Sequence, residues 1–238
     1  MIALAIDTCD SRGSVAVIRA DVVLASAVHE TAEDYSSWLL PAVRDALARS
    51  GIRMADVDLY AVAAGPGSFT GVRVGLTTVK AWAEVYGKPV AAVSRLKAIG
   101  AQSSGSAPYV AAFCDAQRAQ VFGAIYRRNK AELDRQGDER VLTPAQFLEW
   151  AEQTAAGTRI SWVSPDAEQL LAEAAWKGRE RKGETIEPTS PTLAPVIGRL
   201  GLQKAADGHA TDALLLDANY VRRSDAEIFW KGRPAHGG

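Results

Sequence analysis

The sequence of 238 residues predicts an α/β fold of two lobes, each with three strands followed by a helix, a strand and a second helix. Three short apolar runs open the chain at 2–8, 14–18 and 22–28, and residues typical of tight connections separate them. A helical pattern begins only after these runs. A similar start returns near the middle, where Phe-Cys-Asp-Ala at 113–116 repeats the pattern of Ala-Ile-Asp-Thr at 5–8. This repeat indicates an internal duplication of one βββαβα unit.

The lobes are expected to meet at the Ser-Ser-Gly-Ser linker at 103–106, which places them at 1–102 and 103–238. About 100 to 120 residues are enough for each lobe to bury a core of its own. Apolar residues make up 47% of the chain and charged residues 23%, which is typical of globular proteins rather than of disordered or disulfide-built ones.

The net charge and the cysteines indicate which partners and which cellular compartment to expect. The net charge of −1 gives the chain no general attraction to the phosphates of nucleic acids. Cys9 and Cys114 lie far apart in apolar runs, which indicates reduced, buried thiols and a cytoplasmic protein. The first apolar run has no basic residue before it and reaches Asp7 early, so we interpret it as a strand rather than a signal peptide or a membrane span.

The rest of the first lobe alternates helices and strands. A helix is expected at 34–50, because aliphatic residues recur there at helical spacing and Gly51 can cap its end. Pro41 either starts the regular part of this helix or lies inside it. The elements expected next are a strand at 58–64, a turn at 65–71, a helix at 72–86, a strand at 89–93 and a short helix at 94–102.

The second lobe is less regular. Its strands are expected at 109–114, 121–127 and 160–163, and its helices at 144–154, 165–176 and 196–206. A polar loop at 177–185 and a proline-rich connection at 188–195 precede the last helix.

A glycine-rich segment at 65–75 is the strongest local signal. It follows a strand and opens a helix, where backbone N–H groups could hold a phosphate. It lacks the Gly-Lys-[Ser/Thr] of a P-loop, and Thr70 stands where the dinucleotide fingerprint has its third glycine. Gly67, Gly71 and Gly75 are spaced by four, so they line one face and would let another helix approach closely. We favour close packing over ligand contact, and both interpretations stay open.

Asp7, followed by Thr8, and Asp115 each end a strand before a turn. Actin-like ATPases, which are built from a duplicated unit of this kind, place there the aspartates that organise Mg²⁺ and phosphate. Such turns need small residues so that the backbone can approach the phosphates, yet the turn after Asp115 has no glycine before Gly123. We therefore interpret Asp7, Thr8 and Asp115 as remnants of a phosphate site, and we predict no cofactor.

Nothing in the sequence predicts a metal site or a set of catalytic residues. His29, His209 and His236 lie in unrelated segments, without a second ligand at metal-binding spacing. No nucleophile elbow is present, and neither cysteine has an evident base partner. Two modest basic clusters, at 177–182 and 222–233, are interpreted as solvated surface, and contact of either with an RNA or a protein partner stays open.

The segment 65–75, preceded by Ala-Leu-Ala-Ile-Asp-Thr at 3–8 and followed by Pro-Val-Ala-Ala-Val-Ser at 89–94, resembles the TsaB family, also called YeaZ. The likeness is strong over 1–102 and weak over most of the second lobe. It implies a two-lobed actin-like fold of the ASKHA, or ribonuclease H-like, class. It also implies a role in adding threonylcarbamoyl to adenosine 37 of tRNAs that read codons starting with A.

In the family that the sequence resembles, the transferase chemistry belongs to a paralogous partner, TsaD, and an ATPase, TsaE, joins the complex. The resemblance therefore implies that this chain is not an enzyme and meets tRNA through the complex. Two departures from family patterns matter. Arg95 and Ile99 stand where the catalytic paralogue has a metal-binding His-x-x-x-His pair, and Tyr35 stands where the family commonly has His.

Partner binding in the family uses the first two helices, and the same surface is expected to form a homodimer when the chain is free. No membrane partner is expected. The predicted contact residues are Leu39, Leu40, Val43, Leu47, Gly67, Gly71, Gly75, Leu76, Val79 and Ala83. The alternative function is a self-sufficient actin-like ATPase or phosphotransferase, which the positions of Asp7 and Asp115 would favour.

Overall fold

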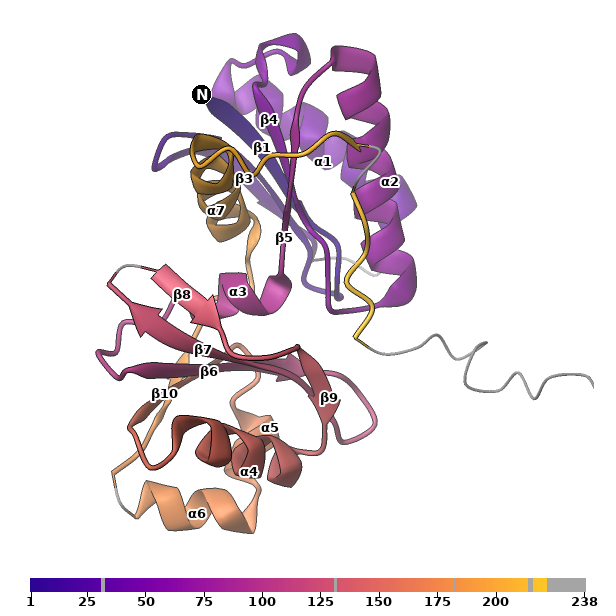
Figure 1. Cartoon of the computed structure of the whole chain (residues 1–238). Coiled ribbons are helices and arrows are strands. Elements are labelled where there is room, and N and C mark those ends of the chain that lie inside the picture. The colour runs from indigo at the N-terminus through magenta and orange to yellow at the C-terminus, as the bar shows by residue number, and fades with distance from the viewer. Residues whose placement is uncertain (31–32, 131, 182, 214–215, 222–238) are drawn as a thin grey trace, which may run out of the picture.

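The computed structural model describes residues 1–30, 33–130, 132–181, 183–213 and 216–221. They form two lobes, one above the other in Figure 1, each with a mixed sheet. The first sheet has the order β3-β2-β1-β4-β5. Its strands are β1 (Ile2–Asp7), β2 (Ser14–Arg19), β3 (Val22–Val28), β4 (Leu59–Ala63) and β5 (Val90–Val93).

The second sheet repeats this arrangement. Its order is β11-β10-β6-β7-β8, with β9 paired to β7 beside the main path. In each sheet the opening strand pairs antiparallel with the next strand and parallel with the first strand after a helix. The predicted duplication and actin-like fold are therefore confirmed. The strands are β6 (Tyr109–Asp115), β7 (Val121–Asn129), β8 (Glu132–Arg135), β9 (Arg140–Leu142), β10 (Ile160–Ser164) and β11 (Ile186–Pro188).

Helices cover both faces of each sheet. They are α1 (Tyr35–Ser50), α2 (Phe69–Tyr86), α3 (Arg95–Gly100), α4 (Pro144–Ala155), α5 (Glu168–Leu171), α6 (Ala174–Glu180) and α7 (Ala194–Ala206), with a 3₁₀ turn at Met54–Asp56. Glycines in the left-handed conformation end the first two, with φ of 66° at Gly51 and 61° at Gly87. Pro41 lies inside α1, which settles the alternative left open by the sequence.

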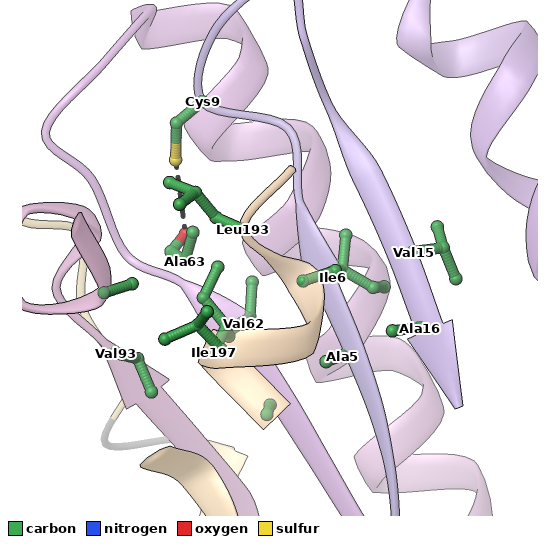
Figure 2. Close-up of a cluster of buried hydrophobic side chains, with 14 of the residues drawn as sticks. Ala5, Ile6, Cys9, Val15, Ala16, Val62, Ala63, Val93, Leu193 and Ile197 are labelled. Carbon is green, nitrogen blue, oxygen red and sulfur yellow. Dashed lines mark hydrogen bonds between the residues drawn. The ribbon is translucent and has the colours of Figure 1, made fainter. Parts of the chain in front are cut away.

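The central strands β1 and β4 of the first sheet are buried on both faces, because successive side chains point to opposite faces and α2 and α7 each pack against these strands. On one face, Gly75 of α2 lies against Ile6 and Val62. On the other, Gly198 of α7 lies against the neighbouring residue of β1, Ala5. Small residues at these contacts bring α7 close to the sheet. Figure 2 shows part of the resulting core, in which the Cys9 thiol donates a hydrogen bond to the Ala63 carbonyl at 3.6 Å.

Two helices are exchanged between the lobes. Helix α3 follows the last strand of the first sheet but packs on β6 and β7 of the second. Helix α7 follows the last strand of the second sheet but packs on β1, β2 and β4 of the first. The division at residues 102 and 103 stays a prediction, and α7 is the part of 103–238 that lies on the first sheet.

The structure differs from the expected elements at several places. Helix α2 begins at Phe69 rather than 72, since the Ser68 side chain already accepts a hydrogen bond from the Gly71 N–H. Two short helices, α5 and α6, replace the single helix expected at 165–176. The short strands β8, β9 and β11 were not predicted. The basic cluster at 222–233 and His236 lie outside the described residues.

Candidate functional site

The strand ends of both lobes meet at a cleft that holds a cavity of ≈ 460 Å³. Turns after β1 and β6, the start of α2 and the segment around Tyr220 contribute to its wall. In open α/β sheets, ligands bind outside the carboxyl ends of strands at such positions. The cleft is therefore the first place to test for a nucleotide site.

Asp7 is fully buried at the end of β1. Its Oδ1 accepts a hydrogen bond from the Cys9 N–H at 2.9 Å, and its Oδ2 lies 3.5 Å from Nε of Arg95. Burial raises the pKa of Asp7, and the adjacent Arg95 only partly opposes this effect. Thr8 is also buried, and its hydroxyl donates to the Gly71 carbonyl at 2.7 Å. The Thr8 hydroxyl and Asp7 Oδ1 are thus engaged by hydrogen bonds within the protein, whereas Asp7 Oδ2 has only the ion pair with Arg95.

Asp115 lies at the end of β6. Its two carboxylate oxygens accept hydrogen bonds from the backbone and side-chain nitrogens of Gln117, at 2.8 and 2.7 Å. The turn that follows contains three successive residues with positive φ, from Gln117 to Ala119. Side chains are rarely accommodated in this conformation, which glycine adopts freely. The carboxylate is thereby held by its own turn.

Arg95 lies between the ends of β1 and β6. It is 1% exposed, its guanidinium contacts Asp10 and Asp7, and its Nη1 lies 3.7 Å from the Cys114 sulfur. Burial tends to raise the pKa of Asp10, but the ion pairs with Arg95 and Arg12 outweigh it, so this pKa is lowered. Burial raises the pKa of the Cys114 thiol to about 12, which leaves it neutral.

Mg²⁺, which the actin-like fold implies together with a nucleotide, does not fit this arrangement. A divalent cation needs free carboxylate oxygens, and the carboxylates here accept hydrogen bonds from, or pair with, Arg95, Arg12 and Gln117. A fixed guanidinium occupies the space between Asp7 and Asp10. Among the residues that the structure describes, no group of three His, Cys, Asp or Glu side chains could hold a metal ion.

The glycine-rich segment packs closely, but against a different neighbour from the expected one. A Cβ on Gly67 would collide with the Cys9 backbone, and one on Gly71 with the Thr8 carbonyl oxygen. A Cβ on Gly75 would come within 2.6 Å of the Thr8 hydroxyl oxygen. The three glycines therefore allow the β1–β2 turn, rather than another helix, to pack closely against the start of α2.

Most of the predicted contact residues face the core of the first lobe. Only Leu40 is strongly exposed, at 56%, and Gly67 is half-buried. The other eight are buried, because they form the inner faces of α1 and α2: Leu39, Val43, Leu47, Gly71, Gly75, Leu76, Val79 and Ala83. Helical spacing identified the apolar stripe, and the lobe's own sheet covers that stripe.

A shallow groove between α1 and α2 remains open on the surface, with a volume of ≈ 540 Å³. Leu40, Phe69 and Val74 line it together with threonine side chains and Arg73. The Arg73 guanidinium lies 3.7 Å from the Phe69 ring centroid, and Nε donates to the Tyr220 hydroxyl at 3.0 Å. This groove joins the N-terminal end of α1 to that of α2.

Tyr35 connects the groove to the cleft. Its hydroxyl accepts a hydrogen bond from the Gly13 N–H at 2.7 Å and donates one to the Asp10 carbonyl. Its ring lies 4.5 Å from the ring of His29, whose two nitrogens contact backbone oxygens. The turn that carries Asp10 is therefore braced by the first residue of α1.

Sequence patterns identified Asp7, Thr8 and Asp115 but missed what surrounds them. Arg95 was noted only as an absent metal ligand, and Asp166 carried no signal at all. Their partners are distant in the sequence, so no local spacing could have revealed them.

None of the described helices is long and apolar enough to cross a membrane.

A duplicated mixed sheet with exchanged helices and a cleft between the strand ends defines the class of two-lobed actin-like proteins. A family model described as "TsaD: tRNA N6-adenosine threonylcarbamoyltransferase" matches residues 23–176. The chain is 31% identical to the tRNA threonylcarbamoyladenosine biosynthesis protein TsaB of Bacillus subtilis, over 97% of this chain and 98% of that protein.

A second curated relative, the TsaB protein of Escherichia coli, is 30% identical over 97% of each chain. A solved structure of YeaZ from Pseudomonas aeruginosa superposes with a TM-score of 0.70 at 26% identity, covering 92% of this chain and 99% of that one. The chain belongs to the TsaB (YeaZ) family, within the wider family that the TsaD model describes.

Proposed function

We propose that this chain is a non-catalytic subunit of the machinery that forms N6-threonylcarbamoyladenosine at position 37 of tRNA. Two full-length relatives carry the name of that biosynthesis. In this proposal the chain binds a TsaD-type catalytic subunit, a TsaE-type ATPase joins the pair, and tRNA is met through the complex in the cytoplasm.

The state of Arg95 carries the non-catalytic part of the proposal. By resemblance, Arg95 and Ile99 match the metal-binding histidines of the catalytic paralogue. Arg95 is buried in ion pairs with Asp7 and Asp10, and Ile99 is fully buried in the core. Neither side chain can offer a metal ligand, so the metal chemistry has to come from the partner.

The groove between α1 and α2 is the surface that we assign to the partner. It presents apolar side chains to solvent between two long helices, which suits the packing of a similar helix pair. Leu40 is its most exposed leucine. The buried residues of the predicted contact set would act indirectly, by holding α1 and α2 in place.

The first experiment is reconstitution of threonylcarbamoyl transfer to tRNA with the cognate partner subunits, with and without this chain. We expect transfer only when it is present and none from it alone. Full activity without it would overturn the proposal. Micromolar ATP binding by the isolated chain, abolished by Asp7→Ala, would instead favour the self-sufficient ATPase.

A substitution in the groove tests the surface. Leu40→Asp should weaken binding of the catalytic subunit by at least about tenfold, because loss of a central apolar anchor of an interface costs about 2 kcal/mol. Leu171→Asp is the matched control, since Leu171 is 44% exposed on the second lobe. Equal affinities of the two variants for the catalytic subunit would show that the groove is not the binding surface.

The same groove is assigned to a homodimer of the free chain. Light scattering should then report a dimer for the wild type and for Leu171→Asp, and a monomer for Leu40→Asp. A dimer that persists in Leu40→Asp would separate homodimerisation from partner binding.

A further inference from the structure

Two arginines from different segments enter the cleft between the lobes. Arg95 is the first residue of α3, the helix that passes from the first lobe to the second. Its guanidinium contacts Asp7 and Asp10 of the first lobe, and Cys114 of the second. A single buried side chain thus touches the strand ends of both lobes.

Arg12 makes a second link across the cleft. It lies in the β1–β2 turn of the first lobe, and its two terminal nitrogens donate to Asp166 of the second lobe at 2.7 and 3.2 Å. The same guanidinium donates to Asp10 at 2.8 Å. This paired geometry is the strong form of an arginine–carboxylate contact.

Asp166 is fixed from its own lobe. It is 5% exposed, and its Oδ2 also accepts a hydrogen bond from the Asp115 N–H at 2.9 Å. Its own N–H donates to the Ser164 hydroxyl oxygen at 2.8 Å. Asp166, which Arg12 contacts, is therefore bonded to the ends of both β6 and β10.

The two guanidinium groups of this cluster offset most of its negative charge. Three carboxylates, those of Asp7, Asp10 and Asp166, converge on two guanidinium groups. Buried carboxylates this close repel each other unless a cation lies between them. A metal ion is one solution to this problem, and the arginines are another.

We propose that Arg95 and Arg12 form an internal clasp that takes the place of a bridging cation and ligand, and holds the two lobes closed. Both guanidinium groups belong to the chain, so closure needs no nucleotide. The lobes then keep one relative position, and the cleft does not respond to Mg²⁺–ATP.

Amide hydrogen exchange of the full chain tests the clasp. In Arg12→Gln, the peptides around Asp115 and Asp166 should exchange about tenfold faster, because one charge-assisted contact to a buried carboxylate is lost. Peptides of β4 and α4, inside the two lobes, should keep their wild-type rates. Arg53→Gln is the control, since Arg53 pairs with Asp56 within one lobe at 2.7 Å.

A second variant tests the role of Arg95 in the clasp. Arg95→Lys keeps the charge but loses the planar fork that reaches several acceptors, so it should loosen the same peptides. Unchanged exchange in both clasp variants would overturn the proposal. Protection of the wild-type cleft peptides by Mg²⁺–ATP would overturn it as well, because the cleft would then accept the ligand that the clasp replaces.

Discussion

The close approach of α2 to the β1–β2 turn makes a sharp prediction for Gly71→Ala. A Cβ at this position would overlap the Thr8 carbonyl oxygen, which belongs to the backbone and cannot rotate away. The Thr8 hydroxyl also donates to the Gly71 carbonyl, so the two segments are tied together at 2.7 Å. Either the start of α2 or the turn has to move.

The expected cost follows from two opposing effects. Overpacking of a close contact costs about 1–3 kcal/mol. The better helix propensity of alanine returns up to about 1 kcal/mol. Because the overlap is with a backbone atom, the upper end of the overpacking cost applies, so the net loss is about 2 kcal/mol and should lower Tm by about 4 to 8 °C for a chain of this size.

Thermal unfolding followed by circular dichroism measures this shift. Gly178→Ala in α6 is the matched control, because nothing lies within 4 Å of its added Cβ and the residue is exposed. That variant should melt at or slightly above the wild-type temperature. If Gly71→Ala melts as high as Gly178→Ala, the glycine is not required by the contact with Thr8.

Three further outcomes are expected. Leu4→Ala removes a fully buried side chain of β1 and should cost about 3–5 kcal/mol in urea unfolding. Trp162→Phe loses the hydrogen bond that the indole N–H donates to Glu184 at 2.8 Å, and should cost about 1–3 kcal/mol by the same assay, whereas no loss would show that the bond is dispensable. Burial raises the pKa of Glu139 above its ordinary value of 4.5, so its contribution to stability is present below that pH and is lost as pH rises through the raised pKa. In Glu139→Gln, the stability should therefore fall less steeply as pH rises. Urea midpoints that fall with pH as steeply as in the wild type would contradict the raised pKa of Glu139.

The duplicated topology could be predicted because each lobe begins with the same local pattern. Apolar runs that end in Asp7 and Asp115 locate the two opening strands without any long-range information. The short strand β8 escaped because Glu132–Arg135 is mostly polar and exposed, so it has no apolar alternation. The place of α7 on the first sheet depends on contacts between segments far apart in the sequence, which periodicity does not report.

The candidate site was predictable only in part for the same reason. Spacing by four showed that Gly67, Gly71 and Gly75 share a face, but spacing does not say what lies opposite. The helical stripe of α1 and α2 was found correctly, and the lobe's own sheet was a nearer partner for it than another protein. Arg95 became informative only when the fold brought Asp7 and Asp10 to its guanidinium.

The exchange of α3 and α7 between the lobes also bears on synthesis of the chain. During translation, every strand of the first sheet leaves the ribosome before the second sheet exists, yet the helix that covers its Ala5 face is encoded after that sheet. The nascent first lobe therefore presents an uncovered apolar surface for most of elongation, a state in which chains are prone to associate.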